Sequence, residues 1–120
     1  MKVYLTDHDS PRISIGIKAP KNRLTIDCLI DTGFSSGIAL GLSLLPKLQP
    51  QKIAEQEFEL ANGIRIFFNV YVVKIWENSK IRELPAIFTE SEDHLVGMEF
   101  LLGHRLMIDL KSKSRKILLE

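Results

Sequence analysis

The tripeptide Asp31-Thr32-Gly33 is the part of this sequence whose residue types can do chemistry together. It directly follows the apolar residues Leu29 and Ile30, so the carboxylate is expected at the end of a strand. Gly33 lets the backbone turn and leaves its N–H near the carboxylate, and the Thr32 hydroxyl can both donate and accept a hydrogen bond. The alternative interpretation is an ordinary tight turn, in which Asp and Gly are common residues.

A carboxylate at the end of a strand can act as an acid or a base if its surroundings move its pKa. Two carboxyl groups that lie close together cannot both ionise cheaply, so they share one proton. One of them then serves as a base for water and the other as an acid for a substrate carbonyl. Asp31 therefore makes mechanistic sense as one carboxylate of such a pair.

The other reactive side chains fit structural roles better. Cys28 lies two residues before Ile30 on the apolar face of the same strand, where a buried small hydrophobic side chain is far more common than a nucleophile. The histidines are scattered without metal-ligand spacing, so we expect no metal site and no cofactor. They are His8, His94 and His104.

The elements that position these residues are mostly strands, because apolar residues recur with a period of two. The predicted strands cover residues 13–17, 24–30, 36–40, 65–75 and 81–88, and residues 106–110 and 116–119 form a closing hairpin. Residues 95–105 are the only convincing helical segment, and residues 42–48 are a loop or a single helical turn. The predicted fold class is all-β with one short helix, in a single domain over residues 1–120.

A further hairpin is predicted at Asn62-Gly63, between Leu60 and the strand that begins near Arg65. Asn-Gly between two alternating apolar runs is a strong hairpin signal. Both residues accept the positive φ angles that such a turn needs.

Three segments together resemble a known family. The run Leu-Ile-Asp-Thr-Gly-Phe-Ser-Ser-Gly at residues 29–37 resembles the active-site loop of the retropepsin-like (clan AA) aspartic peptidases, in particular of their small bacterial and archaeal single-domain members. The segment at residues 95–97, Leu-Val-Gly, resembles their hydrophobic-hydrophobic-Gly motif, which precedes a short helix. Ala61-Asn62-Gly63 resembles the turn of their flap hairpin. All three occur in the family's order.

The resemblance implies a closed β-barrel protomer and an aspartic endopeptidase. The implied catalytic residue is Asp31, the implied active-site loop continues through Thr32, Gly33, Phe34 and Ser35, and the implied flap residues are Ala61, Asn62, Gly63 and Ile64. The implied supporting motif, which packs beneath the Asp31 loop, is Leu95, Val96 and Gly97.

The resemblance also implies partners. Asp-Thr-Gly occurs once in the sequence and the family needs two carboxylates, so the enzyme would be a homodimer with its site on the two-fold axis. The substrate would be an extended peptide or protein, bound as an added strand. Phe34 stands where viral members have a small residue, and Met98 stands where they carry arginine. The ionic network between the subunits of the viral enzymes is therefore not reproduced.

Composition excludes several classes of function. Of 120 residues 45% are apolar, which suffices for a core without metals or disulfides. Sixteen basic and fifteen acidic residues nearly cancel, so no basic face for nucleic acid is expected. The charged N-terminal segment does not resemble a signal peptide, and the apolar stretches are far shorter than the roughly 18 residues that span a bilayer. With one cysteine, we expect a cytoplasmic protein without nucleic-acid or membrane partners.

Two other functions stay open at this point. The same fold can dimerise or hold an extended peptide without cutting it, and a Phe34 side chain that narrows the cleft would favour such a catalytically inactive module. A structural or toxin–antitoxin-like role as a small partner protein is the general expectation for a short domain.

Overall fold

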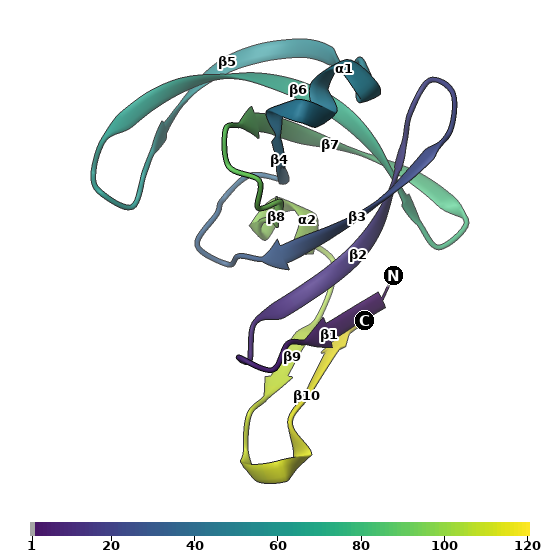
Figure 1. Ribbon diagram of the computed structural model, residues 1–120, viewed down its shortest axis with the longest axis vertical. Helices are drawn as coiled ribbons and strands as arrows, with labels where there is room; N and C mark the ends of the chain where they lie inside the picture. Colours follow the sequence, from purple (N-terminus) through teal and green to yellow (C-terminus); the bar gives the residue numbers. More distant parts are fainter. Residues whose placement is uncertain (1) are drawn as a thin grey trace.

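The computed structural model describes residues 2–120, and most of them form strands (Figure 1). The strands are β1 (Lys2–Leu5), β2 (Pro11–Lys18), β3 (Arg23–Ile30), β4 (Ile38–Gly41), β5 (Gln51–Glu59), β6 (Arg65–Glu77), β7 (Lys80–Thr89), β8 (Leu95–Val96), β9 (Leu106–Asp109) and β10 (Lys116–Leu119). The short helices are α1 (Leu45–Leu48) and α2 (Met98–Leu101), and the 3₁₀ turns are η1 (Leu42–Leu44) and η2 (Ser112–Ser114).

Eight strands form one strongly curled sheet, in the order β1-β2-β3-β8-β4-β7-β6-β5. The sheet bends back on itself, because β2 also pairs with β6 through Ile17 opposite Ile75. The hairpin of β9 and β10 forms a separate small sheet that extends from the body beside β1 (Figure 1). The all-β prediction is confirmed, while closure of the barrel stays a prediction.

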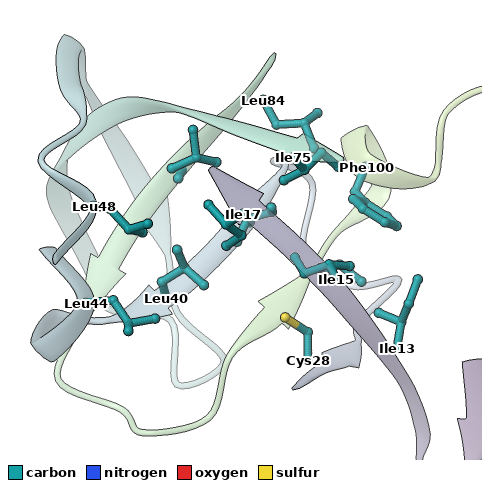
Figure 2. Close-up of a cluster of buried hydrophobic side chains, with 14 of the residues drawn as sticks. Ile13, Ile15, Ile17, Cys28, Leu40, Leu44, Leu48, Ile75, Leu84 and Phe100 are labelled. Carbon is teal, nitrogen blue, oxygen red and sulfur yellow. The ribbon is translucent and has the colours of Figure 1, made fainter. Parts of the chain in front are cut away.

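The hydrophobic core fills the inside of the curl (Figure 2). Ile13, Ile15 and Ile17 are buried on one face of β2, as an alternation with a period of two requires. Cys28 is also fully buried, and burial, with a smaller effect of nearby Asp27, raises the pKa of its thiol to about 12. The thiol therefore stays protonated, and the prediction of a buried small hydrophobic side chain is confirmed.

The helical prediction for residues 95–105 is wrong at both ends. Leu95 and Val96 form β8 because their backbones pair with β3 and β4, and Gly97 separates this strand from α2. α1 is a single helical turn within residues 42–48, so that alternative for this segment is confirmed, and the chain has this second short helix beside α2. Pro46 lies in the first turn of α1, where its missing N–H costs no helical hydrogen bond.

One strand was not evident from the sequence pattern, and a second was evident only at its end, where it enters the predicted Asn62-Gly63 hairpin. β1 is short, and only its pairing with β2 and the packing of Val3 on the core define it. β5 carries exposed side chains over residues 51–57, so it has no buried face that would produce an apolar alternation. Pairing with β6 holds it in place.

Candidate active site

Asp31 directly follows β3 and begins a tight turn. Its backbone N–H donates a hydrogen bond to the carbonyl oxygen of Val96 at 2.9 Å, and its own carbonyl accepts one from the Phe34 N–H at 3.1 Å. The Gly33 N–H donates to Asp31 Oδ1 at 2.9 Å. The turn itself therefore orients the carboxylate. Asp31 is partly exposed, and Thr32, Gly33 and Ser35 are exposed.

The strand β8 supports this turn from within the sheet. It lies between β3 and β4, with Leu95 opposite Leu29 in parallel register and Val96 opposite Ile38 in antiparallel register. Val96 is fully buried. Because one short strand pairs with both segments that flank the turn, the two ends of the active-site loop are fixed relative to each other.

Gly97 lies directly against the active-site loop. Its N–H donates to the Gly37 carbonyl at 2.8 Å, and the next N–H, that of Met98, donates to the Phe34 carbonyl at 2.7 Å. A Cβ atom on Gly97 would lie 2.4 Å from the Ser36 carbonyl oxygen and 2.5 Å from that of Phe34. Such distances are too short for any side chain, so this close backbone approach requires glycine.

The predicted flap corresponds to the hairpin of β5 and β6, which arches over the body in Figure 1. Its turn is closed by hydrogen bonds from the Leu60 N–H to the Ile64 carbonyl at 2.8 Å and from the Gly63 N–H to the Leu60 carbonyl at 2.9 Å. The Asn62 side chain accepts from the Ile64 N–H at 3.0 Å, and Gly63 has a φ of +84°. Ala61 and its neighbours in the turn are exposed.

An aromatic cluster joins the active-site loop to the base of the flap. The ring centroid of Phe34 lies 6.2 Å from that of Phe58 on β5, which in turn lies 5.7 Å from that of Phe68 on β6 in an edge-on arrangement. The sequence analysis did not predict that these three aromatic residues contact one another. The only available signal was that Phe58 and Phe68 precede and follow the predicted turn at similar distances.

Arg82 on β7 holds the segment that follows Gly97. Its guanidinium donates to the carbonyl oxygens of Phe100 at 2.8 Å and Glu99 at 2.7 Å, which are among the last carbonyls of α2 and lack a partner within the helix. Glu77 forms an ion pair with the same guanidinium at 3.4 Å and also contacts His104, whose ring stacks on Phe100. Arg82 was not predicted, because nothing in its local sequence indicates a partner on α2.

A polar network lies on β3 ahead of the turn. Asp27 accepts hydrogen bonds from the Tyr4 hydroxyl at 2.7 Å and from Arg12 Nε at 2.6 Å. Burial raises the pKa of the Asp27 carboxyl, but these two hydrogen bonds outweigh burial and hold the pKa below its usual value. Asp27 is therefore charged at neutral pH and is committed to a structural role.

His94 links the loop before β8 to β4. Its Nδ1 accepts a hydrogen bond from the Gly41 N–H at 3.1 Å, and its carbonyl accepts from the Leu29 N–H at 2.8 Å. Burial lowers the pKa of His94, and the nearby charge of Arg12 lowers it further against the opposing effect of Asp93. A proton on Nδ1 would also remove the acceptor for Gly41.

We expect His94 to make the fold less stable at mildly acidic pH. Since its folded-state pKa lies below the unfolded value of about 6.5, this contribution is complete above that value and is lost as pH falls through the folded pKa. His94→Asn keeps an acceptor for Gly41 without a titratable group, so the free energy of unfolding should change less between pH of about 7 and 5. Urea denaturation of the native and His94→Asn proteins at both pH values measures the free energy of unfolding. An equal dependence of this free energy on pH in the two proteins would contradict the role of His94.

The described residues form neither a metal-binding cluster nor a membrane-spanning helix. Over residues 2–120, no group of three or more His, Cys, Asp or Glu side chains gathers closely enough to hold a metal ion. Within the same range, no helix has the length and apolar character that crossing a membrane requires.

The architecture matches a known structure. A retropepsin-like aspartic protease from Rickettsia conorii superposes on this chain with a TM-score of 0.63 at 16% sequence identity, covering 98% of this chain and 86% of that chain. The chain therefore has a retropepsin-like fold, and the resemblance found in the sequence is confirmed at the level of the fold. A scan against protein-family models and a search of curated proteins gave no match.

Proposed function

We propose that residues 1–120 form one aspartic endopeptidase domain, active as a homodimer, that hydrolyses peptide bonds through a water activated by paired Asp31 carboxylates. The observation that carries the proposal is the turn at Asp31. Its carboxylate accepts the Gly33 N–H at the end of a strand, and Gly97 supports the loop from below, within a retropepsin-like fold.

In the proposed dimer, the exposed turns of two chains meet on a two-fold axis. Asp31 of each chain contributes one carboxylate, and the pair titrates as a unit that keeps one proton over acidic to mildly acidic pH. The ionised carboxylate takes a proton from water, while the protonated one donates to the carbonyl oxygen of the substrate. Thr32 is exposed, and in this dimer its hydroxyl hydrogen-bonds with the loop of the second chain.

The flap gives the proposed enzyme its means of holding substrate. An extended peptide lies between the flap and the Asp31 loop and pairs its backbone with the flap as an added strand. The exposed turn with Ala61, Asn62, Gly63 and Ile64 then covers the peptide and limits the access of bulk water to the carboxylates.

A catalytically inactive peptide-binding or dimerisation module is the second candidate. The observation in its favour is the contact of Phe34 with Phe58, which places an aromatic side chain between the active-site loop and the flap. In this alternative the Asp31 turn is retained for its hydrogen bonds, and the space between the flap and the Asp31 loop binds peptide without hydrolysis.

We expect activity per chain to fall on dilution. Each active site needs two chains, so below the dissociation constant of the dimer the rate of peptide cleavage should rise with the square of protein concentration. Digestion of a broad peptide library at several concentrations and pH values, read by mass spectrometry, measures the rate, and analytical ultracentrifugation measures the dimer.

Two results separate the candidates. If the rate of cleavage per chain stays the same at concentrations where the protein is monomeric, the paired-carboxylate mechanism is contradicted. Absence of cleavage at concentrations where the protein is dimeric favours the binding module. Cell fractionation tests the predicted cytoplasmic location independently of either.

A further inference from the structure

The short helix α2 is hydrogen-bonded to other parts of the chain at both of its ends. At its start, the N–H groups of residues 97, 98 and 99 donate to three carbonyl oxygens of the Asp31 loop, those of Gly37 at 2.8 Å, Phe34 at 2.7 Å and Ser36 at 3.2 Å. At its end, two carbonyl oxygens accept hydrogen bonds from the guanidinium of Arg82. A displacement of α2 would therefore displace the loop as well.

The guanidinium of Arg82 is itself held by a carboxylate. Glu77 on β6 forms an ion pair with Arg82 at 3.4 Å, and only 20% of the Glu77 side chain and 26% of the Arg82 side chain are exposed. Glu77 also contacts His104, whose ring stacks on Phe100 with the two planes 4° apart. Because a partly buried carboxylate that loses its cation is costly, Glu77 keeps Arg82 directed at α2.

We propose that Arg82, oriented by Glu77, is a positioning residue that fixes the Asp31 loop through α2. This inference rests on the proposed function, because it concerns how the same site is held in its active geometry. The hydrogen bonds that the structure gives Arg82 run to α2 and to Glu77, so its effect on the loop is indirect. A carboxylate that must share a proton and activate water needs accurate placement, and an error of about 1 Å can cost about a hundredfold in rate.

Steady-state kinetics of Arg82→Ala test the effect on catalysis. We expect kcat for a cleaved library peptide to fall about tenfold while KM changes by less than about twofold. The reason is that the proposed substrate contacts come from the flap, which Arg82 does not hold, whereas the direction of the Asp31 carboxylate matters in the transition state. The assay is run where urea denaturation shows the native protein and the variant to be fully folded.

Amide hydrogen exchange reports on the loop without requiring cleavage. In Arg82→Ala, the N–H groups of Met98 and Glu99, which donate to the loop, should exchange about tenfold faster than in the native protein. The amides of the core strand β2 should keep their native rates. An equal acceleration in both places would indicate general destabilisation and would overturn the positioning role.

Three further variants separate the geometry of Arg82 from its charge. Arg82→Lys keeps a charge beside Glu77, but an ammonium group cannot reproduce the planar fork that holds two carbonyls, so it should match Arg82→Ala to within about twofold. Glu77→Gln should change kcat and exchange in the same direction, and both of these variants are available if Arg82→Ala does not fold. The control is Arg105→Ala, which removes a side chain that is 79% exposed and pairs with Glu120, and it should change neither measurement.

The outcomes distinguish this role from the proposed activity. Native exchange rates at Met98 and Glu99 in both Arg82 variants overturn the positioning role, as does full recovery of kcat in Arg82→Lys. A loss of kcat/KM that lies wholly in KM also overturns it. If the native protein cleaves no peptide, the peptidase is overturned, and the exchange rates still decide whether Arg82 fixes the loop.

Discussion

Replacing Asp31 with asparagine is expected to reduce peptide hydrolysis by at least about a thousandfold while the fold is retained. The asparagine side chain keeps an oxygen that can accept the Gly33 N–H, the hydrogen bond that orients Asp31. It cannot carry the negative charge that takes a proton from water. The rate of hydrolysis of a cleaved library peptide, together with urea denaturation of both proteins, measures the two effects separately.

A second carboxylate on the same strand provides the control for this substitution. Asp27→Asn alters the hydrogen bonds with Tyr4 and Arg12, so it should cost some stability and leave hydrolysis nearly unchanged. Mixing native and Asp31→Asn chains in equal amounts should leave about a quarter of the dimers with two carboxylates, if chains exchange freely. Activity that falls only to half, or full activity of Asp31→Asn alone, contradicts paired carboxylates.

Gly97→Ala is the second substitution for which we expect a large effect. The added Cβ would lie 2.4 Å from the Ser36 carbonyl oxygen and 2.6 Å from the Phe34 ring, so the loop must move away. Overpacking of this kind typically costs about 2 kcal/mol or more. Because the displaced atoms belong to the Asp31 loop, hydrolysis should fall together with the free energy of unfolding, which urea denaturation measures.

Gly103→Ala separates this steric effect from the general cost of replacing glycine. Gly103 has a φ of +83° and no atom within 4 Å of an added Cβ, so its substitution strains the backbone alone. That strain costs about 1 kcal/mol and should leave hydrolysis intact in the folded protein. If Gly97→Ala were no more harmful than Gly103→Ala, the close approach of Gly97 to the Asp31 loop would not be what holds the turn.

The pH range of the proposed activity is limited by two groups that act in opposite directions. The carboxylate pair needs a shared proton, which favours acidic to mildly acidic solution. His94 accepts the Gly41 N–H only while its Nδ1 is unprotonated, so acid weakens the fold. A pH profile of hydrolysis should therefore be read beside a pH profile of stability.

The fold was predictable wherever a strand buries one face. The alternation of Ile13, Ile15 and Ile17 marks β2, and the apolar positions of β6 and β7 mark those strands in the same way. β5 has exposed side chains over most of its length and left no such pattern. Leu95 and Val96 were misread as helix because a two-residue strand is specified by its distant partners and not by its own sequence.

The candidate site was predictable to the extent that it is local. The Asp31 turn and the close fit of Gly97 both come from short motifs, and at Gly97 an added Cβ would clash with the backbone of the Asp31 loop. Arg82, His94 and Phe58 contribute through contacts with residues far away in the chain, and no spacing rule reveals such pairs. Which distant residues meet depends on the order and register of the strands in the whole sheet. The periodicity of the sequence does not reveal that order.

The place of β8 between β3 and β4 has a consequence for protein synthesis. A nascent chain that has left the ribosome only as far as residue 94 contains Asp31 but lacks the strand that pairs with both flanks of its loop. Pairing across such a sequence distance raises contact order and delays its formation. We therefore expect the Asp31 turn to acquire its final geometry only after Leu95 and Val96 have been synthesised.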